Sequence, residues 1–337
     1  MRLSASERPM SVAPIEVHEY LLCSKVALNS ASVRRIFPGA LIRVGNGHGC
    51  IHPWPEFGDA PLDQHLRSLL EGHPTALAAQ ALHCAALDGQ ARAAGRSLFE
   101  GLQIPRSHYS WSFGLPSAAQ MKRVADEQWP ALKAKGCANV GETREFLNQC
   151  ARFMGDQPLG LRVDFNGCLS RGDFERFIEF MPLRTHQRLD WVEDPFAHDD
   201  EQWDQVRRRW QIRLALDKGW RGARGGFDRV VIKPARRCWR EVAALHHQSV
   251  LVFTSAMDHP IGQMYAALQA ALALQELGPD RLDSGGLCTQ HLFEPNAFLE
   301  RVQSPGGSLQ PDEVGGGLGF GDLLEALPWR KLEQALA

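Results

Sequence analysis

The sequence predicts an α/β protein, a TIM-type (β/α) barrel with an N-terminal α+β capping domain that the C-terminal tail completes. Three observations lead to this prediction. From residue 108 onward, short apolar stretches alternate with helical stretches, eight apolar stretches can be counted, and the preceding residues follow a different pattern. Such alternation implies parallel strands joined by crossover helices, and eight strands are the number that closes a barrel.

The eight predicted barrel strands are short apolar runs, several of them ending in a charged residue. They are Tyr109–Ser112, Ala131–Lys135, Gly160–Asp164, Leu189–Glu193, Arg213–Asp217, Arg229–Lys233, Val250–Ser255 and Leu282–Gly285. Amphipathic helical segments, such as Glu142–Met154 and Gln263–Leu277, separate most of them. A doubly wound open sheet is the alternative. No G-x-G-x-x-G motif follows the first strand to support a dinucleotide site, so the barrel is favoured.

The N-terminal part mixes strand and helix patterns. Ile15–Leu22 alternates as a strand does, and Ala40–Val44 and Cys50–Trp54 flank a glycine-rich turn, which predicts a hairpin. Leu62–Leu70 and Ala76–Leu102 are predicted helices, because they are amphipathic or rich in strong helix formers.

These patterns divide the chain into three parts. We expect a capping domain over residues 1–106, a (β/α) barrel over 107–292, and a C-terminal segment over 293–337 that returns to the capping domain. Pro105 marks the first boundary, and the tail is rich in proline and glycine.

Charge and cysteine content narrow the possible functions. The 337 residues carry a formal net charge of −2 with the signs interspersed, so no basic stripe for nucleic acid is present. The arginine clusters 207–209 and 236–237 are interpreted as solvated helix or loop faces. The eight cysteines form no C-x-x-C pair, which argues against a zinc knuckle or a dithiol redox site.

The expected location is the cytoplasm. Residues 1–13 are polar and lack the apolar core of a secretion signal, and no apolar run approaches the ~20 residues of a membrane span. Scattered cysteines fit reduced thiols in that compartment. We therefore expect neither nucleic acid nor a membrane as a partner. The sequence leaves open whether the protein is a monomer or a homo-oligomer.

Charged residues stand at the ends of five consecutive predicted strands. In chain order these residues are Lys133 with Lys135, then Asp164, Glu193, Asp217 and Lys233. The carboxyl ends of barrel strands form the face where active sites assemble. A single strand-end Asp or Lys is more often a helix cap or a surface ion pair, but that explanation does not cover the whole ordered set. We therefore expect three carboxylates side by side, with lysines on both flanks.

Three neighbouring carboxylates repel one another, and a divalent cation relieves the repulsion. Oxygen ligands favour Mg²⁺ or Ca²⁺ over zinc, and three ligands with room for water and substrate suit Mg²⁺, with Mn²⁺ as the substitute ion. Positive charge nearby disfavours protonation of a lysine, so either flank could supply a base. Coordination of a substrate carboxylate would stabilise the enediolate formed when the α-proton leaves. The sequence thus predicts proton abstraction next to a carboxylate.

Five motifs resemble the active-site strands of the enolase superfamily. They are K-A-K (133–135), V-D-F-N (163–166), V-E-D-P-F (192–196), A-L-D (215–217) and V-I-K-P (231–234), in this order. Segment 81–99 is similar to the long helix of the family's capping domain, and 254–262 and the G-G-G-L-G-F tail extend the likeness over nearly the whole chain. The resemblance implies Mg²⁺-assisted formation of an enediolate by a lysine base.

Lysines on the second and sixth strands point to the muconate-lactonising-like subgroup, and the short E-D-P-F is most similar to that of the o-succinylbenzoate synthases. This resemblance implies that Lys135 removes the α-proton and later assists departure of hydroxide. Lys233 would stabilise the enediolate from the opposite side, and Lys133 would be an auxiliary charge. The implied reaction is dehydration of 2-succinyl-6-hydroxy-2,4-cyclohexadiene-1-carboxylate to o-succinylbenzoate, a carbon–oxygen lyase step toward menaquinone.

The same resemblance assigns further residues to the site. Asp164, Glu193 and Asp217 would hold the metal, and Asn166 would lie near it behind these ligands. The pocket would be formed by Arg162, Thr254, Ser255 and Asp258.

One departure and two rival functions remain open. The family commonly follows its third ligand with an acid, whereas Lys218 follows Asp217 here; strand alternation predicts that Lys218 points away from the metal. A racemase of N-acylamino acids or a dipeptide epimerase would use the same site, with Lys135 and Lys233 exchanging the proton. A non-catalytic metal-binding scaffold is the alternative from another class.

Overall fold

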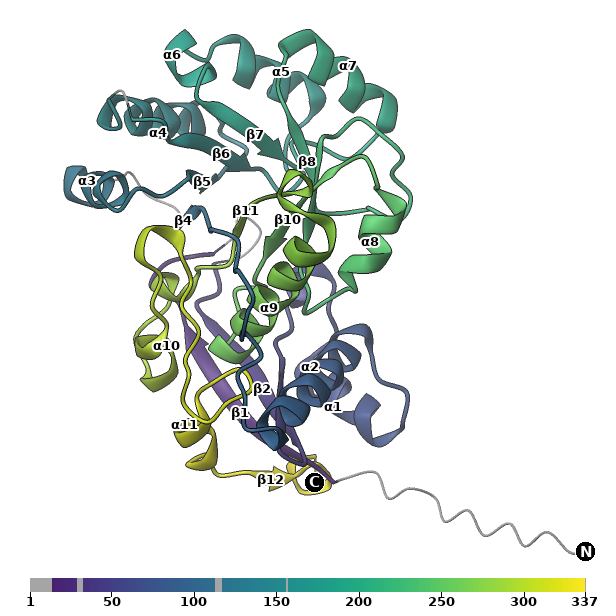
Figure 1. Cartoon of the computed structure of the whole chain (residues 1–337). Helices are drawn as coiled ribbons and strands as arrows, with labels where there is room; N and C mark the ends of the chain where they lie inside the picture. The colour runs from purple at the N-terminus through teal and green to yellow at the C-terminus, as the bar shows by residue number, and fades with distance from the viewer. Residues whose placement is uncertain (1–13, 29–32, 113–116, 156, 337) are drawn as a thin grey trace, which may run out of the picture.

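The computed structural model describes residues 14–28, 33–112, 117–155 and 157–336. The polar stretch 1–13, on which the expectation of no secretion signal rests, lies outside these residues. The described strands form two sheets, one of eight strands and one of four. Figure 1 shows the eight-stranded sheet and its helices above the N-terminal sheet. None of the helices in the described ranges is long and apolar enough to cross a membrane.

The eight-stranded sheet is a near-closed parallel barrel, which confirms the predicted fold class. Its strands run in chain order around the barrel, and each adjacent pair is parallel. They are β4 (Tyr109–Trp111), β5 (Ala131–Lys135), β6 (Gly160–Asp164), β7 (Leu189–Glu193), β8 (Leu214–Leu216), β9 (Arg229–Ile232), β10 (Val250–Thr254) and β11 (Leu282–Gly286). A parallel bridge between Ser107 and Gly285 joins the first and last strands.

Helices follow most of the barrel strands along the chain. They are α3 (Ala118–Asp126), α4 (Val140–Phe153), α5 (Arg171–Glu179), α6 (Leu183–His186), α7 (Asp200–Trp210), α8 (Trp239–Leu245) and α9 (Pro260–Leu277). Between β8 and β9, the described residues 217–228 contain no helix. Asn139 and Ser170 begin α4 and α5 by accepting backbone N–H groups, as capping residues do.

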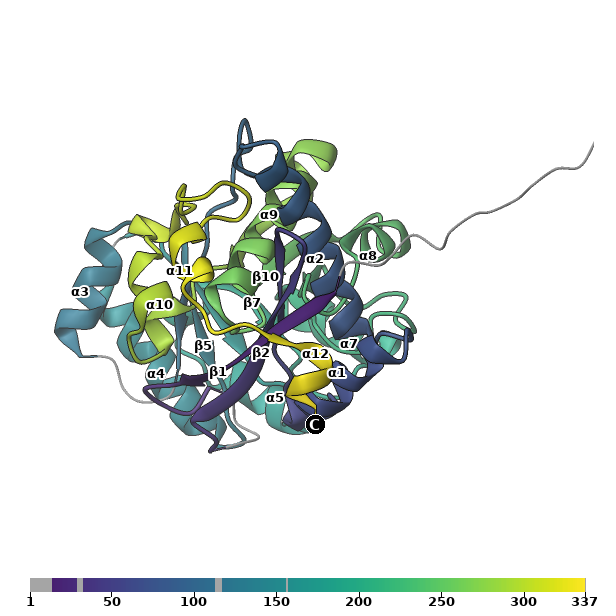
Figure 2. The same ribbon diagram turned by 90° about the horizontal axis from the view of Figure 1, so that it is seen from below.

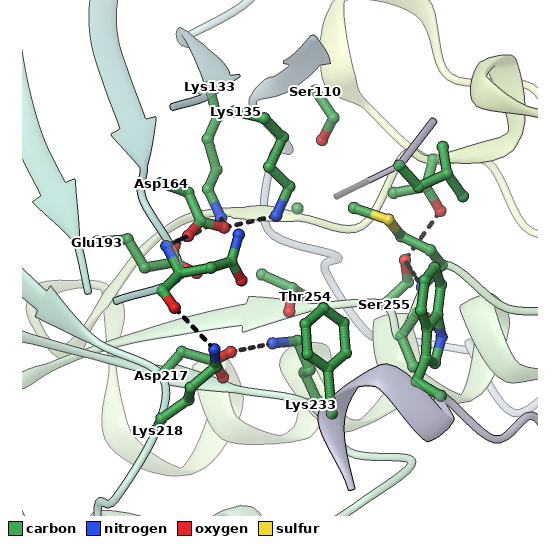
Figure 3. A pocket seen from close by; sticks show the side chains of 18 of the residues that line it. Ser110, Lys133, Lys135, Asp164, Glu193, Asp217, Lys218, Lys233, Thr254 and Ser255 are labelled. Carbon is green, nitrogen blue, oxygen red and sulfur yellow. Dashed lines mark hydrogen bonds and ion pairs between the residues drawn. The ribbon is translucent and has the colours of Figure 1, made fainter. Parts of the chain in front are cut away.

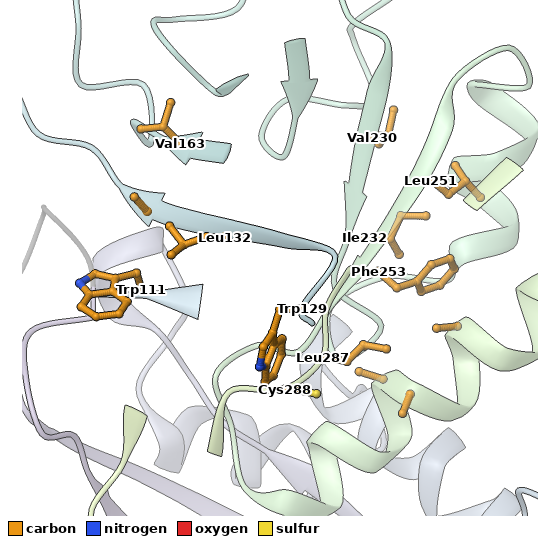
Figure 4. Packing of buried hydrophobic residues seen from close by; sticks show 14 of the residues in the cluster. Trp111, Trp129, Leu132, Val163, Val230, Ile232, Leu251, Phe253, Leu287 and Cys288 are labelled. Carbon is orange, nitrogen blue, oxygen red and sulfur yellow. The ribbon is translucent and has the colours of Figure 1, made fainter. Parts of the chain in front are cut away.

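The main core lies between the strands and their helices. Leu132, Val163, Ile232 and Phe253 belong to it and are fully or almost fully buried (Figure 4). Because side chains alternate along a strand, the neighbours of these residues face the barrel interior. This alternation explains how β5 can bury Leu132 and still direct Lys133 to the inside.

The N-terminal unit is an antiparallel sheet covered by two helices. β1 (Ile15–Cys23), β2 (Ile36–Val44) and β3 (Gly47–Ile51) pair in sequence. Helices α1 (Leu62–Leu70) and α2 (Ala76–Ala93) pack on the sheet.

The C-terminal segment returns to this sheet. It contains α10 (Ala297–Arg301) and α11 (Gly321–Glu325), and then β12 (Arg330–Lys331), which pairs antiparallel with β1. The last helix, α12 (Leu332–Ala335), also lies against β1 (Figure 2).

Three predicted boundaries in the N-terminal unit were wrong. β2 begins at Ile36 instead of Ala40, because it pairs with β1 over its whole length. β3 begins at Gly47, since a two-residue turn is enough to reverse the chain. Helix α2 ends at Ala93, well before the predicted Leu102, and Gly95 just beyond it adopts φ 63°, a left-handed conformation typical of helix ends.

Glycine in β3 lets α2 approach the sheet closely. A Cβ atom at Gly49 would lie 2.1 Å from the carbonyl oxygen of Ala81. We predict that Gly49→Ala lowers the free energy of unfolding by roughly 1–3 kcal/mol, the usual cost of overpacking, in urea denaturation. Gly225→Ala is the control, because a Cβ there would meet nothing within 4 Å. Equal stability of the two variants would contradict the predicted close packing.

Candidate active site

A cavity of about 310 Å³ opens at the carboxyl ends of the barrel strands (Figure 3). Its walls include all six charged residues that the sequence places at strand ends. Trp54 and Phe57 of the N-terminal unit also line it, so both units enclose the space. A volume of this size is at the lower end of the range for small-molecule sites.

On one side of the cavity, two lysines of β5 face two carboxylates. Lys135 Nζ lies 2.6 Å from Asp164 Oδ2, and Lys133 Nζ lies 3.1 Å from the same oxygen. Lys133 Nζ is also 2.6 Å from Glu193 Oε2. The register of the parallel strands sets this arrangement, since Lys135 pairs with Asp164 and Asp164 with Glu193.

On the other side, Lys233 forms an ion pair with Asp217 Oδ2. Arg237 Nη2 donates to Asp217 Oδ1 at 3.1 Å and to its carbonyl oxygen at 3.0 Å. In the view of Figure 3, the ammonium groups of Lys135 and Lys233 approach the cavity from opposite sides. The structure therefore brings the three carboxylates and the three lysines into one space.

Burial and mutual repulsion raise the pKa values of the carboxylates, whereas the neighbouring cations lower them, and the balance differs from one carboxylate to the next. Burial and the nearby Asp164 raise the pKa of Glu193 to about 7. Burial acts the same way on Asp217, but Lys233 and Arg237 outweigh it and lower its pKa to about 2. Burial also opposes ionisation of Asp164, and the two β5 lysines nevertheless hold its pKa well below the usual range. Each of the three carboxylates is thus kept ionised only as far as the neighbouring lysines and Arg237 offset the effects of burial and repulsion.

The donor set fits a hard divalent cation. All three side chains offer carboxylate oxygens, they end adjacent strands, and each is at most 7% exposed. In this structure the lysines form ion pairs with the three carboxylates. Among the described residues, no three acidic, His or Cys side chains lie close enough together to form a preformed metal site. A cation would take over the role that the ammonium groups have here.

Three other predicted residues line the same cavity. Thr254 lies between Lys135 and Lys233 in the view of Figure 3, and its buried hydroxyl has no hydrogen-bond partner in the described part of the chain. Ser255 Oγ lies 2.8 Å from Thr289 Oγ1. Asn166 also lines the cavity, and its buried side-chain amide nitrogen has no hydrogen-bond partner within the ranges that the structure describes.

Two predicted pocket residues are not in the cavity lining. Arg162 is one layer deeper in the barrel, where its guanidinium donates to Asp190 at 2.8 Å and to Asp283 at 2.8 Å. Strand alternation explains this place: Arg162 faces inward like Asp164, but two residues before the strand end. Asp258 is buried behind the wall, close to Gly262 at the start of α9, and is not a lining residue either.

Lys218 also differs from the expectation. Its Nζ donates to the carbonyl oxygen of Asn166 at 3.0 Å and lies 5.3 Å from the ring centroid of Phe57. Lys218 therefore spans the rim of the cavity instead of pointing away from it, because the chain has left β8 at Leu216 and strand alternation no longer applies.

The arginine pair 236–237 was wrongly interpreted as a solvated face. Arg236 forms a two-pronged ion pair with Asp59 of the N-terminal unit, with nitrogen–oxygen distances of 2.6 and 2.5 Å, and Arg237 binds Asp217. Asp194 was missed as well, and its Oδ1 accepts from the backbone N–H of Asp217 at 3.0 Å. The arginines follow Lys233 closely in the chain, and Asp194 follows Glu193 directly. This closeness to predicted site residues could have indicated that they belong to the site.

Two models of known protein families match this chain. The family model described as Enolase C-terminal domain-like matches residues 117–321, more than half of the chain. The protein belongs to the enolase superfamily, which confirms the resemblance. The model described as O-succinylbenzoate synthase, N-terminal domain, matches residues 15–91.

Individual relatives cover almost the whole chain. An o-succinylbenzoate synthase of Bdellovibrio bacteriovorus is 29% identical over an alignment of 333 residues, which covers 95% of this chain and 98% of that protein. Among solved structures, muconate lactonizing enzyme of Pseudomonas fluorescens, in complex with muconolactone, has a TM-score of 0.73 at 15% identity, covering 91% of this chain and 95% of that one. A dipeptide epimerase of Enterococcus faecalis V583, crystallised with Mg and L-Leu-L-Tyr, has a TM-score of 0.70 at 15% identity, covering 92% and 99%. At these identities the solved structures support the fold.

The ion-pair layer beneath the cavity supports a stability prediction. Arg162 is 2% exposed and is the most buried cation facing Asp190 and Asp283. We expect Arg162→Met to cost roughly 3–5 kcal/mol of unfolding free energy, because it removes the buried cation that two partly buried carboxylates share.

The control for this prediction is Arg213→Met, which removes a 59% exposed side chain 3.3 Å from the same Asp190. It should cost less than about 1 kcal/mol. Similar urea midpoints for the two variants would show that the layer does not depend on Arg162.

Proposed function

We propose that this enzyme is a Mg²⁺-dependent carbon–oxygen lyase that dehydrates 2-succinyl-6-hydroxy-2,4-cyclohexadiene-1-carboxylate to o-succinylbenzoate, a step of menaquinone biosynthesis. The observation that carries the proposal is the set of two opposed lysines, Lys135 and Lys233, around three carboxylates in one cavity. The similarity to an o-succinylbenzoate synthase over nearly the full length, and the match of the N-terminal domain model, support this choice of reaction.

Asp164, Glu193 and Asp217 would hold the cation. When bound, Mg²⁺ would supply positive charge beside the substrate carboxylate and so acidify the adjacent C–H bond. The rest of the chemistry belongs to residues of the chain.

Lys135 would act as the base. It would exchange its ion pair with Asp164 for neighbouring positive charge, which favours the neutral amine that a base requires. Its Nζ would accept the α-proton, and the same proton would later pass to the departing hydroxyl group as the C–O bond breaks. One water molecule leaves, and the ring becomes aromatic.

Lys233 would remain an ammonium group. From the opposite wall it would stabilise the negative charge that develops on the carboxylate oxygens while the proton is on Lys135. Lys133, which contacts both Asp164 and Glu193, would keep these side chains in place as an auxiliary charge. Trp54 and Phe57 would exclude water from this space.

The second candidate function is racemisation of N-acylamino acids or epimerisation of dipeptides. The favouring observation is the same pair of opposed amines, which could exchange a proton across one carbon atom, and a structural neighbour is a dipeptide epimerase. Incubation of N-acylamino acids and dipeptides in D₂O separates the two. The lyase proposal expects dehydration without rapid exchange of the α-proton in these compounds, and fast exchange without dehydration would refute it.

Replacement of the base gives the next prediction. We expect Lys135→Ala to lower kcat for dehydration by about 10²–10⁴-fold, the usual contribution of a positioned general base. Lys122→Ala, which alters an exposed lysine paired with Asp126 on α3, is the control and should keep the wild-type rate. Dehydration at an undiminished rate by the Lys135 variant would remove the assignment of the base.

The metal proposal is tested by binding rather than by rate. We expect Glu193→Gln to weaken Mg²⁺ at least roughly tenfold in calorimetric titration, because one of three ligand charges is lost. Glu241→Gln, at an exposed glutamate, should bind as the wild type does. Chelation should also abolish dehydration, with recovery on addition of Mg²⁺ and not of a monovalent salt. A wild-type rate in the presence of chelator would rule out the mechanism.

A further inference from the structure

His108 is a buried histidine at the floor of the cavity that the proposed mechanism does not use. It directly precedes β4, is 1% exposed, and lines the cavity. Its ring is 6.3 Å from that of Trp191, centroid to centroid, and the Arg162 guanidinium is 4.8 Å from the Trp191 ring. The residue therefore connects the cavity to the ion-pair layer below it.

The neighbours of His108 decide which ring nitrogen carries a proton. Arg162 Nη1 lies 3.0 Å from His108 Nδ1, and an arginine can only donate. Nδ1 must therefore accept this hydrogen bond, and the proton of the neutral ring must reside on Nε2. Arg162 has no freedom to turn, since Asp190, Asp283 and the carbonyl oxygen of Ser284 hold its other N–H groups.

The ring is also kept uncharged. Burial, Arg162 and Lys133 hold the pKa of His108 well below its usual range. A neutral imidazole with a fixed N–H is a directional donor and adds no charge to a site that already contains three lysines.

Nε2 has no hydrogen-bond partner among the described residues, and His108 is one of the residues that line the cavity. A Cβ atom at Gly286, another lining residue, would lie 3.0 Å from Nε2 and 3.1 Å from Thr254 Cγ2. A side chain at position 286 would therefore press against Nε2, and glycine avoids that contact. Thr254, 6% exposed, adds to the same wall a buried hydroxyl that no other described residue binds.

We propose that His108 binds substrate as a neutral Nε2–H donor to a carbonyl or carboxylate oxygen on the part of the substrate distant from the reacting carbon, with Arg162 as its positioning residue. β4, β10 and β11 carry this floor, across the barrel from the carboxylates of β6, β7 and β8. A ligand whose reacting carboxylate lies at those carboxylates would place its far end here. The identity of that ligand rests on the proposed function, whereas the tautomer does not.

Two variants of His108 distinguish between its two possible roles. One role is to donate a hydrogen bond to a ligand, and the other is only to hold Arg162 in place. His108→Asn keeps an acceptor where Nδ1 was and removes the donor, so it should weaken o-succinylbenzoate about five- to tenfold in calorimetry with Mg²⁺ present, as expected for one lost hydrogen bond. His108→Gln keeps an N–H donor near the Nε2 position and should stay within about twofold of the wild type. The opposite order would overturn the proposal and leave His108 as a structural partner of Arg162.

The oxygen that His108 binds is identified with two analogues of o-succinylbenzoate, one without the ketone and one without the terminal carboxylate. The analogue that lacks the true acceptor should bind the wild type and His108→Asn equally. If both analogues still discriminate between the two proteins as o-succinylbenzoate does, the donor does not reach the side chain of the ligand and the proposal fails.

The tautomer is tested without any ligand. In ¹⁵N NMR of the free wild-type protein, the signals absent from His108→Asn should report a protonated Nε2 and an unprotonated Nδ1. A proton on Nδ1, or on both nitrogens, would refute the proposal. Failure of the wild type to bind o-succinylbenzoate would instead refute the proposed function, and the variants would then be compared with an N-acylamino acid that the wild type does bind.

Discussion

The site depends on the repulsion among three carboxylates that adjacent parallel strands force together. Asp164, Glu193 and Asp217 are almost completely buried, and burial raises the cost of leaving like charges uncompensated. In the structure, ammonium groups of β5 and ammonium and guanidinium groups of the segment that follows β9 form ion pairs with these carboxylates. In the proposed mechanism, the same lysines would become available for chemistry when another cation binds these oxygens. One electrostatic constraint therefore links the stability of the site with its proposed mechanism.

The barrel makes this arrangement possible because strand alternation separates two tasks. Outward residues such as Leu132 and Val163 pack against helices, while inward residues form charged layers. The upper layer contains the carboxylates and lysines of the cavity, and the lower one contains Arg162 with Asp190 and Asp283. His108 contacts Arg162 of the lower layer and also lines the cavity, so the lower layer can control how a cavity residue presents its hydrogen bonds. Contacts of the N-terminal unit, such as that of Asp59 with Arg236, join the roof of the cavity to the segment after Lys233.

Much of the barrel could be predicted from the sequence, and the reason is local. Each strand is a short apolar run, and β5, β6 and β7 have the predicted ends because a charged residue stops the run where the chain reaches the active face. The convergence of the strand-end residues follows from the closure of the barrel. In contrast, the depth of Arg162, the path of Lys218 and the partners of Arg236 and Arg237 depend on residues far away in the chain. Asp59 lies 177 residues before Arg236, and no local pattern reports such a pair. The end of α2 was missed because helix propensity continues past the point where tertiary packing stops the helix.

A crystal structure with Mg²⁺ and o-succinylbenzoate would test the central claim most directly. We predict one ion about 2.1 Å from an oxygen of each of Asp164, Glu193 and Asp217, as octahedral Mg²⁺ requires. We also predict that the amines of Lys135 and Lys233 lie on opposite faces of the ligand. Carboxylates that keep their lysine partners while the ion binds elsewhere would contradict it.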